Sequence, residues 1–219
     1  MARFRRLDVL QAMMDSGLVP VFYHKDLETA KKVARAVADG GVKVLEFTNR
    51  GDFAWQIFSA LIQWCESEIP DLILGVGSVI DPGTASLYIN DGANFIVGPI
   101  LNAEVARTCN RRKIPYLPGC GSASEISQAE EYGVEICKIF PGKEVGGGGI
   151  REEYSRTDAL DAHHADRGRG DDQGIHRGLV QGGGGLRGGR FEPDIEGADR
   201  RRRLRGDNPK DGFRPHLDQ

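Results

Sequence analysis

Lys138 is the first residue whose surroundings suggest chemistry, because it interrupts an otherwise apolar segment. It lies in "VEICKIF" (134–140), between Cys137 and Ile139. Burial among such neighbours favours the neutral form of an amine. A neutral amine can attack a ketone and form a Schiff base, which then acts as an electron sink. The alternative is a lysine at a strand end whose charged group extends into water.

Glu46 and Arg50 form a second candidate constellation, in "VLEFTNRG" (44–51). Glu46 ends a segment that is otherwise apolar, and a carboxylate in such a place, with a raised pKa, can carry protons. Arg50, in the loop that follows, could hold a substrate carboxylate through a two-pronged contact. The alternative is a structural ion pair, formed between these two residues or between Glu46 and Lys43.

The remaining motifs give no support for a cofactor or a metal. "GVGS" (75–78) lacks the full dinucleotide fingerprint, and "FPGKEVGGGG" (140–149) has no Ser or Thr after its lysine, as a phosphate-binding loop requires. His163 and His164 are adjacent, so in regular structure they would not face one side. The cysteines form no CxxC pair: Cys65, Cys109, Cys120 and Cys137. We therefore predict neither a cofactor nor a metal site.

Composition narrows the cellular setting and the partners. Net charge is −3, and the arginine run 200–203 has acidic residues nearby, so neither nucleic acid nor an anionic membrane is expected to bind. No apolar run reaches the roughly 18 residues of a membrane span. The N-terminus lacks the apolar core of a secretory signal. Unpaired thiols suit a reducing compartment, so the predicted location is cytoplasmic.

Short apolar runs alternate with segments of helical periodicity along the first 149 residues. Six strand–helix units are expected, with strands in 18–23, 42–47, 72–78, 94–99, 114–119 and 134–140. The first helix should be amphipathic, with Leu7, Leu10, Met13 and Met14 on one side, while Gly40 should end the second helix and Asp81–Pro82 should begin the fourth. Uniformly apolar strands predict a parallel sheet, either doubly wound or closed as a (β/α)8 barrel. In both, chemistry sits at the C-terminal ends of the strands.

Five segments, in order, resemble the 2-keto-3-deoxy-6-phosphogluconate (KDPG) aldolase family, whose members also include 4-hydroxy-2-oxoglutarate (KHG) aldolases. They are "GGVKVLEFTNR", "GVGSV", "GANFIVGP", "IPYLPGC" and "VEICKIFPG", and the resemblance covers residues 1–148. It implies a (β/α)8 barrel, a metal-independent class I mechanism and a homotrimer. It assigns Lys138 as the Schiff-base lysine, Glu46 as the proton carrier, and Arg50, Ser78 and Pro99 as substrate-binding residues. Ser78 stands where the family usually has threonine, and Gly98 replaces a common serine.

From Ile150 onward the resemblance ends, although the family has two further strands and its phosphate site there. Residues 150–219 contain 13 glycines and 13 arginines but only eleven Leu, Ile, Val and Phe, which is too few to form a core. A shifted reading frame explains this composition: the codons of "RTDALDAHHADR" (156–167), read one base later, allow G-P-M-P-W-T-R-I-M-P-T-G. The family pattern there is P-W-T-R-I-M-P-T-G-G. Similarly, "RGGRFEPD" (187–194) allows V-G-G-G-S-N-L-I, close to the family's V-G-G-G-S.

We therefore predict two regions: an aldolase barrel over 1–148, incomplete after about six βα units, and a disordered, frameshifted tail over 149–219. By resemblance, the substrate is a 2-keto acid. KDPG would be cleaved to pyruvate and glyceraldehyde 3-phosphate, or KHG to pyruvate and glyoxylate. Two alternatives stay open, namely an inactive aldolase remnant and a non-enzymatic α/β platform with a Gly/Arg-rich RNA-binding tail.

Overall fold

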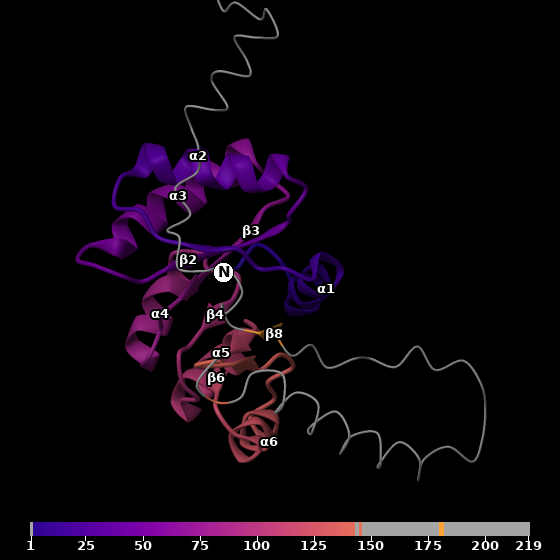
Figure 1. Cartoon of the computed structure of the whole chain (residues 1–219). Helices are drawn as coiled ribbons and strands as arrows, with labels where there is room; N and C mark the ends of the chain where they lie inside the picture. The colour runs from indigo at the N-terminus through magenta and orange to yellow at the C-terminus, as the bar shows by residue number, and fades with distance from the viewer. Residues whose placement is uncertain (1, 143–144, 146–179, 182–219) are drawn as a thin grey trace, which may run out of the picture. The chain divides into compact units, whose positions relative to one another are not determined.

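The computed structural model describes residues 2–142, residue 145 and residues 180–181. The chain divides into two units, residues 1–185 and 186–219, and all described residues belong to the first. Its helices are α1 (Arg6–Ser16), α2 (Leu27–Asp39), α3 (Ala54–Glu68), α4 (Pro82–Asn90), α5 (Ala103–Arg112) and α6 (Ala123–Glu131). Its strands are β1 (Val21–Phe22), β2 (Val44–Thr48), β3 (Ile73–Gly77), β4 (Ile96–Val97), β5 (Tyr116–Leu117), β6 (Gly119–Cys120), β7 (Lys138–Ile139) and β8 (Val180–Gln181). The predicted alternation of strands and helices is confirmed over residues 6–139 (Figure 1).

The strand order decides between the two predicted architectures. Strands β1 to β5 pair in parallel in chain order, and β6, β7 and β8 do the same. Pro118, which has no N–H to donate, separates β5 from β6, and its carbonyl accepts the backbone N–H of Lys138 at 2.9 Å. A doubly wound sheet reverses its order at a switch point, whereas a barrel places each strand next to its chain neighbour. The order therefore favours the barrel.

Strand residues divide between two apolar layers because successive side chains point to opposite faces. Leu45 and Phe47 of β2 pack in the layer formed with the helices, and Figure 1 shows α2 and α3 side by side over this part of the sheet. Val44 and Ile73 belong to the inner layer. Every residue of β2 and β3 is buried, as the uniformly apolar runs predict.

Helix α1 covers the inner layer at the side where the strands begin. Its buried residues are Val9, Leu10 and Met13, and they pack with the inner strand residues. The expectation that Leu7 and Met14 share the buried side was wrong, since they are 75% and 43% exposed. Apolar residues lie on several sides of this short helix, so the surface that it covers decides which ones are buried.

Helix boundaries follow local capping chemistry. Asp81 accepts the backbone N–H of Thr84 at 2.8 Å, and Pro82 occupies the first turn of α4, which confirms the predicted start. Asp26 caps α2 in the same way through Thr29. Gly40 ends α2, as predicted.

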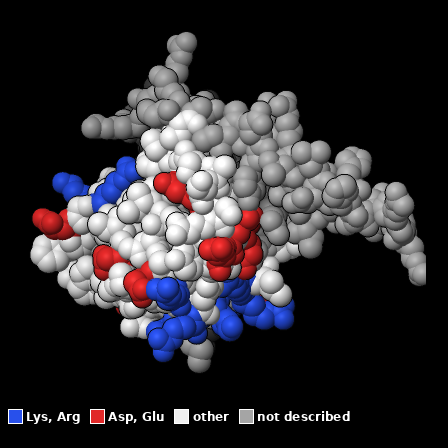
Figure 2. Space-filling model, turned by 90° about the horizontal axis from the view of Figure 1, so that it is seen from below, with Lys and Arg blue, Asp and Glu red and all other residues white. Residues whose placement is uncertain are grey.

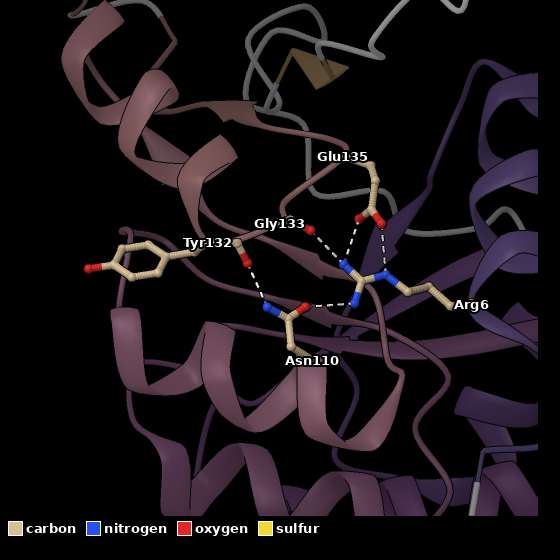
Figure 3. Close-up of polar contacts among 5 residues, drawn as sticks. All are labelled: Arg6, Asn110, Tyr132, Gly133 and Glu135. Atoms are coloured by element: carbon tan, nitrogen blue, oxygen red, sulfur yellow. Dashed lines mark hydrogen bonds and ion pairs between the residues drawn. The ribbon is translucent and has the colours of Figure 1, made fainter.

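An arginine near the N-terminus connects α1 to the segment that leads into β7 (Figure 3). The Arg6 guanidinium makes a two-pronged contact with Glu135, at 2.8 Å for each hydrogen bond. It also donates to Asn110 Oδ1 at 2.7 Å and to the Gly133 carbonyl at 2.6 Å. Asn110 in turn donates to the carbonyl of Tyr132. The first helix and the sixth unit are thereby joined at the base of β7.

The tail contributes one strand that sequence analysis did not expect. In β8, Val180 and Gln181 pair in parallel with Lys138 and Ile139 of β7. Among the described strands β8 does not pair with β1, so the barrel is incomplete in this part of the chain. Residues 149–179 and 182–219 lie outside the described residues, and their predicted disorder stays a prediction.

Candidate active site

Strand alternation brings Glu46 and Lys138 to the same inner face. Val44 and Ile136, two positions before them, both belong to the inner apolar layer. Because side chains two residues apart in an extended chain share a face, Glu46 and Lys138 lie on this inner face. Glu46 is the middle residue of β2 and Lys138 the first residue of β7, so the expected position at the C-terminal strand ends was wrong for both. The sequence-predicted pair therefore converges from strands that are far apart in the chain.

Glu46 is buried with little polar support. It is 5% exposed, and its carboxylate makes no hydrogen bond within the described residues. Burial raises its pKa from 4.5 to about 7, although the positive charges of Lys138 and Arg50 act in the opposite direction. A carboxyl group with this pKa can both release and accept a proton near neutral pH.

The absence of a side chain at Gly77 leaves room for the Glu46 carboxylate. A Cβ built on Gly77 would overlap Oε1 of Glu46. In the β2–β3 register Glu46 pairs with Gly75, and Gly77 pairs with Thr48. Gly77 therefore follows Gly75 by two residues and lies on the same inner face. The close approach shows that only glycine at this position leaves the carboxylate where it lies.

Lys138 is half-buried, although its strand neighbours Cys137 and Ile139 are buried. Its ammonium nitrogen lies 4.6 Å from the centre of the Phe140 ring. Phe140 follows Lys138 by two residues and is 38% exposed. The lysine is thus less enclosed than its apolar neighbours suggest, and an aromatic face lies beside its amine.

Arg50 is exposed and lies in a tightly held loop. The backbone N–H of Asn49 donates to the Gly77 carbonyl, and that of Arg50 donates to the Thr48 carbonyl, both at 2.8 Å. Within the described residues neither Arg50 nor Lys43 forms an ion pair with Glu46, so the structural ion pair considered as an alternative is not observed. Arg50 nevertheless lies close enough to act on the Glu46 charge.

Ser78 and Pro99 occupy the strand ends between Glu46 and Lys138. Ser78 follows Gly77 directly and has a left-handed backbone with φ of 62°, a conformation that few non-glycine residues adopt. Its hydroxyl has no hydrogen-bond partner in the described part of the chain. The Pro99 carbonyl lies against Gly119, which pairs with Lys138, and leaves no room for a Cβ there.

Two residues that were not predicted from the sequence, Phe140 and Gly77, also contribute to this site. Phe140 could have been found by the same two-residue spacing that places Lys138 inward. The role of Gly77 depends on a contact with another strand, so no local pattern reveals it. Three or more His, Cys, Asp or Glu side chains do not gather as potential metal ligands anywhere in the described residues.

A parallel barrel with an amine and a carboxyl group on its inner face has the architecture of a barrel enzyme. The family described as "KDPG and KHG aldolase" matches residues 9–152, and the chain belongs to this family. A 2-dehydro-3-deoxy-phosphogluconate aldolase of Treponema pallidum is 31% identical over 150 residues, which are 68% of this chain and 70% of the relative. The KHG/KDPG aldolase of Escherichia coli is 34% identical over 63% of either chain.

Solved structures agree with the fold. A KDPG aldolase from Legionella pneumophila, with pyruvate captured as a covalent carbinolamine intermediate, has a TM-score of 0.58 and 30% identity. The match covers 75% of this chain and 72% of that one. The barrel implied by the sequence resemblance is thereby confirmed.

Proposed function

We propose that this barrel is a class I aldolase site in which Lys138 is the nucleophile and Glu46 carries the protons. The observation that supports this most is the inward convergence of the two side chains, with the Glu46 pKa raised to about 7. The substrate is a 2-keto acid with a hydroxyl group on C4: KDPG, KHG or both. Cleavage gives pyruvate and an aldehyde, which is glyceraldehyde 3-phosphate from KDPG and glyoxylate from KHG.

The reaction begins when the neutral amine of Lys138 attacks the C2 ketone to give a carbinolamine. The carbinolamine hydroxyl takes up a proton and leaves as water, which gives an iminium ion. Glu46 then takes the proton of the C4 hydroxyl, through water, while the C3–C4 electrons move into the iminium and the aldehyde departs. The resulting enamine receives a proton from Glu46 at C3, and water releases pyruvate and the free amine. A carboxyl group that titrates near pH 7 suits both transfers.

Arg50, Ser78 and Pro99 are proposed to bind the substrate. The Arg50 guanidinium suits a carboxylate. The Ser78 hydroxyl, which has no partner among the described residues, is available to a substrate oxygen. Pro99 lines the strand end next to Lys138 through its contact with Gly119.

The tail is proposed to be a frameshifted product with a boundary near residue 148. The family match stops at residue 152, while the Treponema pallidum relative extends beyond the 70% that is covered. Activity of the chain in its present form is therefore proposed to be low, and an inactive remnant is the second candidate.

Homotrimer formation and a cytoplasmic location remain predictions. No described helix is long and apolar enough to cross a membrane, and the face in Figure 2 has acidic and basic groups intermixed.

Reductive trapping tests the assignment of Lys138. Pyruvate and borohydride should leave a stable adduct on Lys138, located by peptide mass mapping, and Lys138→Met should abolish it. Lys113→Met, which removes a lysine at the end of α5, serves as the matched control and should be trapped normally. An adduct on another lysine, or none, would contradict the proposal.

A further inference from the structure

Two tyrosines hold the loop that carries Arg50. The Tyr88 hydroxyl, from α4, donates to Asn49 Oδ1 at 2.8 Å. The Tyr23 hydroxyl lies against Gly51, where a Cβ would approach it to 2.7 Å. Gly51 has φ of 92°, which favours glycine. Arg50 is thus flanked by Asn49, which Tyr88 holds through a hydrogen bond, and by Gly51, against which the Tyr23 hydroxyl lies.

The Tyr88 hydroxyl donates its hydrogen bond from a buried and tightly packed ring. Tyr88 is 1% exposed, and its ring packs edge-on against Phe58 with 5.1 Å between centres. Burial raises the pKa of Tyr88 to about 12, and the negative charge of Asp91 acts in the same direction. The phenol therefore remains protonated at neutral pH and continues to donate.

Asn49 connects the Tyr88 hydroxyl to the loop that carries Arg50. Its side chain is held by Tyr88 and its backbone N–H by the Gly77 carbonyl. The Arg50 N–H donates to the Thr48 carbonyl, so the main chain from which the Arg50 side chain leaves is restrained by two backbone hydrogen bonds. Arg50 itself is exposed, and its side chain makes no hydrogen bond to the described residues that could orient it instead.

We propose that Tyr88 is a positioning residue, which acts through Asn49 to hold Arg50 for the carboxylate of the 2-keto acid. The proposal rests on the function proposed above, in which Arg50 binds that carboxylate. It predicts an effect on substrate affinity without an effect on the amine chemistry, since Tyr88 touches neither Lys138 nor Glu46 in the described contacts.

The test is Tyr88→Phe, which keeps the ring and removes only the donor. In borohydride trapping, the pyruvate concentration that gives the half-maximal rate should rise about 3- to 10-fold, which is the effect expected when one hydrogen bond is lost. The maximal rate should stay unchanged. Tyr132→Phe is the matched control and should change neither value. A fall in the maximal rate without a change in half-saturation would overturn the proposal.

A second measurement does not depend on catalysis. The charged groups that act on Glu46 are Lys138 and Arg50, so displacing Arg50 should raise the titration midpoint of Glu46. The midpoint is read from the carboxyl carbon-13 shift, assigned with Glu46→Gln. Tyr88→Phe should raise it in the same direction as Arg50→Gln, and Tyr132→Phe should not. If no pyruvate adduct forms in the unmodified chain, the proposed function fails, whereas an unmoved midpoint in Tyr88→Phe overturns the positioning role.

Discussion

The carboxylate of Glu46 lies directly against the Cα of Gly77, in the place that any larger side chain would fill. A buried acid is thereby accommodated by a missing Cβ on the neighbouring strand. The contact joins the middle of β2 to the last residue of β3, on the inner face that Lys138 shares. Gly77 thus belongs to the site without having any chemistry of its own.

Gly77→Ala should displace the Glu46 carboxylate and slow the proton transfers that depend on it. Exchange of the pyruvate methyl protons with solvent deuterium requires the Schiff base and the carboxyl group, but no phosphate contact. We expect this exchange to slow about 100-fold, because a positioned acid–base group typically contributes that much. Proton NMR of pyruvate in deuterium oxide measures the rate.

A double-mutant cycle with Glu46→Gln provides the control. If Gly77 acts only through Glu46, the double variant should exchange no more slowly than Glu46→Gln alone. Additive losses would instead show that the methyl group damages the site in another way. Circular dichroism should show that both single variants are folded.

Glu46→Gln should change how stability depends on pH. The folded pKa of about 7 lies above the ordinary 4.5, so between these values the unfolded chain loses a proton that the folded chain retains. The unfolding free energy therefore falls as pH rises from about 4.5 to 7, by about 3 kcal/mol in total from this group. Glu46→Gln should lack this fall, so its stability relative to the unmodified chain should increase across that range.

Urea denaturation at pH 4.5, 6 and 8 measures this difference. If the difference in unfolding free energy between the two proteins is the same at all three pH values, Glu46 is not desolvated in the folded chain. The same titration predicts that pyruvate proton exchange in the unmodified chain rises as pH increases towards about 7, because the ionised carboxylate is the base.

Arg6→Met should destabilise the chain more than Arg5→Met does. The Arg6 side chain is 16% exposed and contacts three partners, one in α5 and two in the segment that leads into β7. Arg5 is 85% exposed and its side chain pairs only with Asp8, three residues further along the chain. Loss of the Arg6 contacts should cost about 1 to 2 kcal/mol, while an exposed pair within one helix should cost nothing measurable. Urea denaturation compares the two, and equal effects would show that the contacts in Figure 3 do not stabilise the fold.

Local patterns were sufficient to predict the helices and strands of the barrel. The start of α4 depends on Asp81 and Pro82 alone, and the buried strands are visible as uniformly apolar runs. The inward placement of Glu46 and Lys138 follows from the same reasoning, because both interrupt such runs. The buried side of α1 was predicted in part: Leu10 and Met13 are buried as expected, but Val9 rather than Leu7 faces the barrel, because the packing surface selects between them.

Contacts between distant residues could not be predicted in this way. Tyr88 and Asn49 are 39 residues apart, and Arg6 and Glu135 are 129 apart. No periodicity connects such positions. The strand β8 is a similar case, because its two residues lie in a segment with no apolar rhythm and pair in parallel with β7.

Restoring the reading frame should raise activity on the phosphorylated substrate far more than on the unphosphorylated one. The family resemblance places the phosphate site in the last two strand-end loops, which residues 149–219 replace if the proposed frameshift is correct. Phosphate lies far from the reacting carbons, and binding it holds KDPG in its reactive geometry. Sequencing the gene across codons 144–152 identifies the base to restore.

The comparison uses kcat/KM for both proteins on KDPG and on KHG. For KDPG we expect at least about 100-fold lower kcat/KM in the present chain, the scale of loss when a substrate is poorly positioned. For KHG the loss should be smaller, because that substrate has no phosphate to hold, and it should reflect only the more open surroundings of Lys138. These surroundings affect both substrates alike. Equal losses on the two substrates would assign the whole defect to the Lys138 site, and equal activity of the two proteins on KDPG would show that the tail itself supplies the phosphate contact.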